Sequence, residues 1–211
     1  MLKYKKRIRL FGELGVYMKF IKENSYDIVK LIINQVGITI FSLVLLFTAQ
    51  GANLPAVFKP IFSVFSTLFY FALLYTVSWE FGAKDKIRID AGRYSASKGK
   101  GILLGLAANA FNILLGIVSI VSMVIHMMTN AQWLADLFGV ANILMRFILA
   151  MYIGMIQSMT TALSGNVDFL VESILYLVFP LVAVAVVGFG YFMGAKDLRI
   201  FSSTVKNNVK K

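Results

Sequence analysis

Apolar residues are gathered into five long runs, separated by short polar stretches. The runs cover roughly 31–49, 61–78, 102–128, 137–158 and 173–193. Each reaches or passes about 18 residues, the length at which an apolar run becomes a candidate membrane-spanning helix. The pattern predicts an all-α fold, a polytopic membrane bundle of four transmembrane helices, or of five if every run crosses.

Composition supports a membrane protein over a soluble one. The 211 residues are 59% hydrophobic and 15% charged, with a mean hydropathy of +0.78, whereas soluble domains are about half apolar and one quarter charged. No cleavable signal peptide is expected at the amino terminus, so the first run should remain as an anchor. The excess of lysine over arginine favours a bacterial source. The location expected for the multi-pass chain is the plasma membrane.

The positive charges fall into three clusters. Eight Lys and Arg residues lie within 1–30, six within 82–100 and five within 194–211; only Lys59 and Arg146 lie elsewhere. Positive residues in short loops stay on the cytoplasmic side. Four crossings place all three clusters, and therefore both termini, in the cytosol. The net charge of +11 is thus assigned to the membrane surface and not to nucleic acid.

Arg146 makes 137–158 the run least suited to cross. An arginine at mid-membrane costs about 2.5–3.5 kcal/mol, and the ten large apolar residues of this run return roughly 3–6 kcal/mol. Because these two contributions nearly cancel, the charge distribution decides for four crossings. We expect this run to lie at the outer interface or to re-enter the membrane; five crossings remain the alternative.

Two similar stretches occur more than a hundred residues apart. Residues 79–89 read WEFGAKDKIRI and residues 191–201 read YFMGAKDLRIF, and each follows a long apolar run. This similarity predicts a tandem repeat of helical hairpins, a common arrangement in membrane transport proteins. The chain would then form one membrane domain, 1–211. It would begin with a cytoplasmic amphipathic helix (1–27) and a first hairpin with its basic loop (28–100). A second hairpin (101–200) with an external or re-entrant insertion at about 129–172 and a basic tail (201–211) would follow.

The shared Gly-Ala-Lys-Asp is interpreted as a repeated helix stop at the cytoplasmic surface. Glycine can end a helix in the left-handed conformation, and lysine beside it favours the negative end of the helix dipole and the lipid phosphates. The alternative is a paired docking site for a cytoplasmic partner. The residues concerned are Gly82, Lys84, Asp85, Gly194, Lys196 and Asp197.

The amino-terminal segment predicts an amphipathic helix on the anionic cytoplasmic face of the membrane. Its apolar face has three- and four-residue spacing and is formed by Tyr4, Ile8, Phe11, Leu14, Met18 and Ile21. Packing of this helix on the protein's own cytoplasmic loop is the alternative.

A strip of small and polar residues follows the third apolar run, formed by Gly105, Asn109, Asn112, Gly116, Ser119 and His126. Small residues let helices approach closely, and Asn or Ser can hydrogen-bond between them. The strip is interpreted as a helix-packing surface, or alternatively as one wall of a polar pathway. His126, the only histidine, is expected to be packed or interfacial rather than a metal ligand or proton sensor.

Arg146 is expected to pair with a carboxylate of the same insertion, and the candidates are Asp136, Asp168 and Glu172. The favoured interpretation is a salt bridge that pins the insertion. The alternative is a gate or a contact for an anion.

Patterns of catalysis are missing from the chain. It has no Walker A motif, no G-x-S-x-G and no H-E-x-x-H, so an enzyme, a cofactor and a metal are not expected. The function predicted is that of a small transport-related membrane component, acting as a homo-oligomer or as a subunit of a membrane complex. The competing prediction is a non-transporting scaffold or accessory subunit that binds a cytoplasmic partner or anionic lipid through its basic segments.

Overall fold

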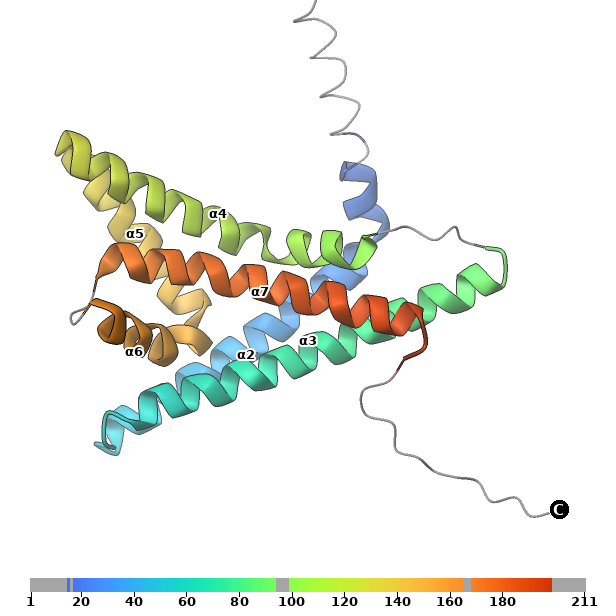
Figure 1. Cartoon of the computed structure of the whole chain (residues 1–211), viewed down its shortest axis with the longest axis horizontal. Helices are drawn as coiled ribbons and strands as arrows, with labels where there is room; N and C mark the ends of the chain where they lie inside the picture. Colours follow the sequence, from blue (N-terminus) through green and yellow to red (C-terminus); the bar gives the residue numbers. More distant parts are fainter. Residues whose placement is uncertain (1–14, 16, 94–98, 165–167, 199–211) are drawn as a thin grey trace, which may run out of the picture.

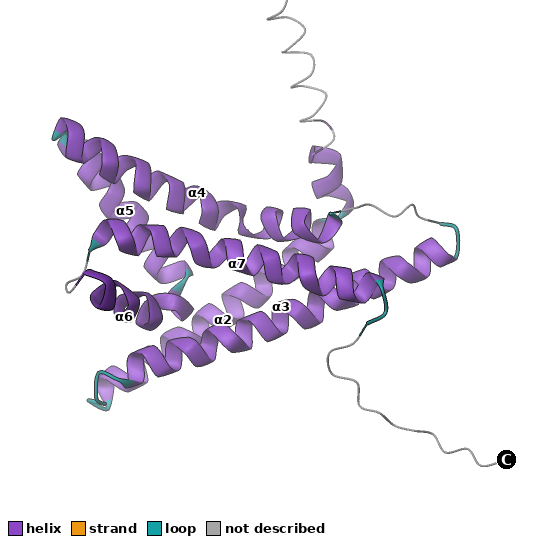
Figure 2. Ribbon diagram, viewed as in Figure 1, coloured by secondary structure: helices purple, strands orange, loops and turns teal. Residues whose placement is uncertain are grey.

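The computed structural model describes residues 15, 17–93, 99–164 and 168–198 (Figure 1). Every regular element in these ranges is helical (Figure 2). The long helices are α2 (Ser25–Gly51), α3 (Phe58–Asp90), α4 (Lys100–Thr129) and α7 (Phe169–Ala195). Between α4 and α7 lie α5 (Gln132–Ile148), the short 3₁₀ helix η1 (Ala150–Tyr152) and α6 (Ile153–Ser164).

Four helices are long and apolar enough to cross a membrane. Helices α2 and α7 have 27 residues each, α4 has 30 and α3 has 33. At about 1.5 Å per residue, even the shorter helices exceed the roughly 30 Å of a hydrocarbon core. The prediction of an all-helical chain with four such helices is therefore confirmed at this level.

Helix α7 lies between α3 and α4 and packs on both along much of its length (Figure 1). It runs in the same direction as α3 and opposite to α4, while α2 packs on α3 and α4. We call the end of the molecule where α3 and α7 finish and α4 starts the basic end. The opposite end, where α4 finishes and α7 starts, is the elbow end.

The apolar run 137–158 forms a broken pair of helices. Helices α5 and α6 meet at a bend of 83°, which we call the elbow and which comprises Leu149 to Tyr152. Helix α5 starts beside the last turn of α4, and α6 finishes near the start of α7, so the pair leaves and returns to the same end of the molecule (Figure 1). Counted as one span, the pair would make a fifth crossing.

Side chains of α2 and α3 satisfy the backbone at the elbow. The Thr39 hydroxyl donates to the Ile148 carbonyl oxygen at 2.8 Å, and those of Ser63 and Thr67 donate to the Met151 carbonyl oxygen at 2.5 and 3.3 Å. All four elbow residues are buried. Buried backbone groups at a helix break need hydrogen-bond partners from elsewhere in the protein, and here three hydroxyl groups supply them.

The first Gly-Ala-Lys-Asp is not a helix stop. Helix α3 continues through Gly82 and Asp85 to Asp90, and Gly82 keeps a helical backbone because its missing side chain serves close packing, as described below. The second copy does end a helix, since α7 finishes at Ala195 and Asp197 has a left-handed φ of 55°. The proposed helix stop therefore applies to one copy only.

The predicted amphipathic helix falls largely outside the described residues, as does the tail 201–211. In the described part, residues 17–23 are helical, and Met18 and Ile21 on their predicted apolar face are exposed.

Candidate functional site

The polar strip of α4 faces the inside of the bundle. Asn109 and Asn112 are each 3% exposed. The Asn112 amide donates to the Gln35 side-chain oxygen of α2 at 3.1 Å and to the Asn109 side-chain oxygen at 3.2 Å. Asn109 donates to the Gly105 carbonyl oxygen at 3.1 Å. These three side-chain amides are therefore joined by hydrogen bonds, as residues at a helix-packing interface often are.

The rest of the strip also contacts protein. The hydroxyls of Ser119 on α4 and Ser173 on α7 lie 2.9 Å apart, and Ser119 is fully buried. A side chain added at Gly105 would press on the backbone of Val184, across the interface with α7. His126 Nδ1 lies 3.1 Å from the Ala131 carbonyl oxygen, at the turn between α4 and α5, so it belongs to the elbow end rather than to the interior of the strip.

The two similar stretches meet each other across the α3–α7 interface. A Cβ added to Gly82 would collide with the Tyr191 carbonyl oxygen, and one added to Gly194 would collide with the Trp79 carbonyl oxygen. Tyr191 stands three residues before Gly194, and Trp79 stands three residues before Gly82, so the two contacts are reciprocal. Small residues allow such close backbone approach between membrane helices. Gly82 and Gly194 thus have a packing role that sequence reasoning missed.

Asp85 of the first stretch is buried in a polar cluster at the basic end. Its Oδ2 accepts from Lys100 Nζ at 2.6 Å and from the Tyr191 hydroxyl at 2.8 Å, while Arg88 Nη1 lies 3.6 Å from Oδ1. The side chains of Asp85 and Lys100 are each 4% exposed. Lys100, predicted as a surface cation of the basic loop, is instead one half of a buried ion pair. The cluster joins α3, α4 and α7.

The lysines of the two stretches remain on the surface. Lys84 and Lys196 are exposed, and Lys196 Nζ lies 4.3 Å from the centre of the Phe192 ring. Asp197 is exposed as well. A docking surface at the basic end would therefore use these lysines, whereas Gly82, Asp85 and Gly194 are buried in the protein.

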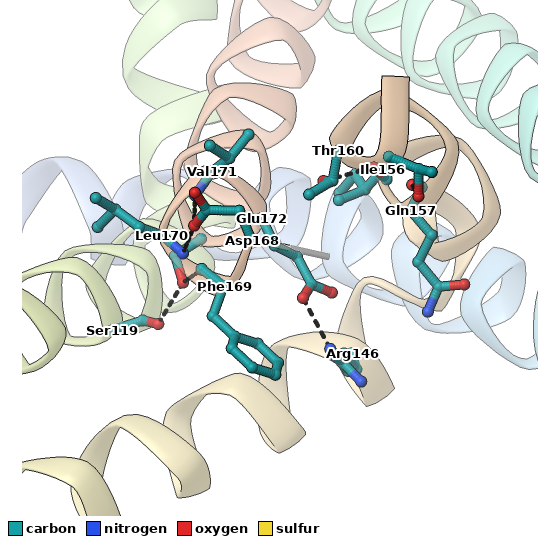
Figure 3. A network of polar contacts seen from close by, with 12 residues as sticks. Ser119, Arg146, Ile156, Gln157, Thr160, Asp168, Phe169, Leu170, Val171 and Glu172 are labelled. Atoms are coloured by element: carbon teal, nitrogen blue, oxygen red, sulfur yellow. Dashed lines mark hydrogen bonds and ion pairs between the residues drawn. The ribbon is translucent and has the colours of Figure 1, made fainter. Parts of the chain in front are cut away.

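Arg146 on α5 pairs with Glu172 on α7, which is the third of the three carboxylates considered from the sequence. Arg146 Nη2 lies 2.8 Å from Glu172 Oε2 (Figure 3). The Glu172 side chain is 0% exposed and that of Arg146 is 35% exposed. Asp168 instead caps α7 by accepting from the backbone amides of Leu170 and Val171.

Asp136 lies apart from this ion pair. Its carboxylate accepts from the Gln132 side-chain amide at 3.4 Å, one turn away on the exposed start of α5. The single ion pair Arg146–Glu172 thus fastens α5, just before the elbow, to the first turn of α7.

A hollow of about 230 Å³ opens beside this ion pair, between the end of α2, the start of α3 and the elbow. We call it the elbow hollow. Its polar lining is Gln50, Lys59, Arg146 and Gln157, and its apolar lining comes mainly from α2 and from Phe147. Figure 3 shows the Gln157 side chain extending from α6 toward the ion pair. A second hollow of about 530 Å³ adjoins it and shares Lys59 and Gln157.

Sequence reasoning did not bring Lys59 and Arg146 together. They are the two basic residues outside the three clusters, yet both line the elbow hollow, although 87 positions separate them. Their isolation from the three basic clusters was the only feature of the sequence that set these two residues apart. They come together only because α5 and α6 fold back onto α2 and α3.

Among the residues that the structure describes, no three His, Asp or Glu side chains gather where they could hold a metal ion. Comparison of the chain with protein-family models, with curated proteins and with solved structures finds no match.

Proposed function

We propose that this protein is a small transport-related component of the plasma membrane, with four crossings, both termini in the cytosol, and a homo-oligomeric or subunit role. The observation that carries the proposal is the broken pair α5–α6, bent by 83° and anchored inside the bundle. Broken helices that meet at membrane depth are typical of transporter binding sites.

The place proposed for a solute is the elbow hollow rather than the α4 strip. Asn109, Asn112 and Ser119 bond to neighbouring side chains or backbone, which favours the packing interpretation of the strip. Lys59 and Gln157, by contrast, line a hollow. The proposal therefore keeps the predicted class of function and moves the site to the elbow.

The proposed topology explains the charge pattern. Helices α2, α3, α4 and α7 cross, and α5 and α6 re-enter from the outer side, because the pair starts and finishes at the elbow end. The basic end then faces the cytosol, as the positive-inside rule requires. The parallel α3–α7 pair, with its reciprocal glycine contacts, also suits a tandem hairpin repeat.

The second candidate function is a scaffold or accessory subunit. The observation that favours it is the exposure of Lys84 and Lys196 on two stretches that are packed together. Such a paired cationic surface fits anionic lipid or an acidic cytoplasmic partner. Reversing both charges should abolish capture of a cytoplasmic partner; unchanged capture removes this candidate.

Topology can be tested directly because the chain has no cysteine. Single cysteines are introduced at Ser95, Ala131 and Ser203, and intact cells are treated with a membrane-impermeant maleimide. Only position 131 should be labelled. Labelling at position 203 would establish five crossings and overturn the proposed orientation of the carboxyl terminus.

The transport proposal requires that the elbow open to both sides. Single cysteines at Ile153 and Gln157, which line the hollow, are probed with the same reagent in intact cells and in inside-out vesicles. A transport element should expose at least one of them from each side, in different fractions. Labelling from the outer side alone would refute transport and leave the accessory role. A cysteine at Met128, which is 80% exposed at the elbow end, is the one-sided control.

A further inference from the structure

The elbow hollow gathers positive charge at the end of the molecule opposite the basic clusters. Lys59 is exposed and makes no ion pair with any residue in the described ranges. Arg146 donates a hydrogen bond from Nη2 to Glu172, and this is one of the five N–H donors that a guanidinium carries. Lys59, Arg146 and Glu172 together leave a net charge of +1, so one negative charge can still be accommodated.

Two helix starts add to this potential. Helix α3 begins at Phe58, next to Lys59, and α6 begins at Ile153, which lines the hollow. The starts are in contact, because a Cβ added to Gly154 would collide with the Lys59 carbonyl oxygen. The first backbone amides of both helices are already paired, since those of Phe58 and Lys59 donate to Pro55 and Ala56 and that of Ile153 donates to Ala150. The helix starts therefore add only the positive ends of their dipoles, and the two cationic side chains supply the groups that would hold an anion.

The lining also changes in character along α2. The positions that face the hollow, Leu43, Leu46, Phe47 and Gln50, follow the spacing of one helix face. They span about 10 Å at 1.5 Å per residue. Leu43 lies about two turns before Gln50, which is in the last turn of α2. The hollow thus combines an apolar wall along α2 with two cationic side chains in the rest of its lining, as an amphiphile with a charged head requires.

Its size indicates how much of a ligand enters. The hollow of about 230 Å³ is smaller than the roughly 300–1,000 Å³ of sites that enclose a drug-sized molecule. A head group and the first part of one chain can fill it, while the remainder stays outside. A membrane lipid meets this condition, because the rest of it lies in the bilayer.

We propose that the elbow hollow binds an anionic phospholipid, with the phosphate between Lys59 and Arg146 and the start of an acyl chain along the apolar face of α2. Gln50 and Gln157 donate hydrogen bonds to the head group. The inference rests on the membrane setting under Proposed function, but not on transport, since a lipid bound only as a structural partner fits it equally well.

The test places a fluorescent bimane on a single cysteine at Ser158, which lines the adjoining hollow together with Lys59. The full chain is reconstituted in phosphatidylcholine nanodiscs, and phosphatidylglycerol or phosphatidylcholine bearing a nitroxide on the acyl chain is added as quencher. Phosphatidylglycerol should quench the dye with a several-fold preference. A dye at Met128, at the same end but on α4, should show no preference.

Substitutions identify the binding group. Lys59→Gln should weaken the preference about three- to tenfold, because it removes one charge-assisted hydrogen bond to the phosphate, and Lys59→Glu should abolish it. Lys84→Gln removes one lysine of the paired cationic surface at the basic end, at the opposite end of the molecule from the dye at position 158, and is the matched control for general attraction of anionic lipid. Lys59 is exposed, so folding of its variants should be retained, which circular dichroism checks.

Three results would overturn the proposal. One is equal quenching by the two lipids at position 158. Another is an equal effect of Lys59→Gln and Lys84→Gln, which would mean diffuse attraction to the surface. The third is full competition by millimolar glycerol phosphate, which would identify a soluble anion as the ligand. The cysteine labelling test of transport uses no lipid probe, so failure of either proposal is seen separately.

Discussion

The ion pair between Arg146 and Glu172 allows the sharpest test of how the elbow is held. The two partners differ in exposure, at 35% for the arginine side chain and 0% for the glutamate side chain. The structure therefore predicts that loss of the arginine and loss of the glutamate lower the free energy of unfolding by different amounts. Replacing either residue by leucine, and then both, separates their contributions.

Arg146→Leu is the costly change. It leaves a fully buried carboxylate without its cation, and breaking a buried pair in this way typically costs about 3–5 kcal/mol of the free energy of unfolding. Glu172→Leu leaves an arginine that can still reach solvent or lipid phosphate, so about 1–2 kcal/mol is expected. The double variant removes both charges and fills the space with apolar groups, which is often neutral. We expect it within about 1 kcal/mol of the parent.

The assay is reversible unfolding of the purified protein in bicelles, followed by circular dichroism, and a double-mutant cycle is built from four proteins. A coupling energy of at least about 2 kcal/mol is expected, with Arg146→Leu the least stable of the four. Additive single effects, or a double variant as unstable as Arg146→Leu, would refute the view that a stranded carboxylate causes the loss. Asp136→Leu, on an exposed carboxylate of the same helix, is the control and should change stability by less than about 0.5 kcal/mol.

Three further predictions concern packing. Gly194→Ala should lower the free energy of unfolding by about 1–3 kcal/mol, because the added methyl group would meet the backbone of α3. Gly139→Ala, with open space around it, should be neutral or stabilising, and equal effects of the two substitutions on unfolding would contradict the close α3–α7 contact. Asn112→Leu should lower the free energy of unfolding by about 1–2 kcal/mol, because the Gln35 side-chain oxygen loses its hydrogen-bond donor. Adding Gln35→Leu to the same chain should restore most of this stability, and no recovery would argue against a shared packing role. Ser63→Ala should raise the rate of backbone amide hydrogen exchange at the elbow, because the buried Met151 carbonyl oxygen loses one donor. An unchanged rate would show that the Ser63 hydroxyl does not hold the bend.

The long helices could be predicted from the sequence because their cause is local. A run of about twenty apolar residues must satisfy its backbone internally wherever it is placed in a membrane, and a helix is the way one segment can do so alone. The runs 31–49, 61–78, 102–128 and 173–193 accordingly lie inside α2, α3, α4 and α7. The amide and serine positions of the α4 strip could also be recognised, because helical spacing places them on one face.

The elbow and its hollow could not be predicted in this way. Arg146 marked the run 137–158 as the one least suited to cross, but no residue within the run places the break near Leu149. There the hydroxyl groups of Thr39 and Ser63, from other helices, donate to backbone carbonyl groups. The role of Gly82 was misread for a similar reason, since glycine can either end a helix or let another helix approach, and the choice depends on whether α7 lies against it.

By itself, the sequence therefore determined where the four long apolar helices lie and the separation of most cations from Lys59 and Arg146. Tertiary structure decided which carboxylate pairs with Arg146, where the fourth apolar run breaks, and that Lys59 stands beside the break. The physical reason is one of range. Helix formation is governed by hydrogen bonds four residues apart, whereas these features arise from contacts between segments that only meet once the chain has folded.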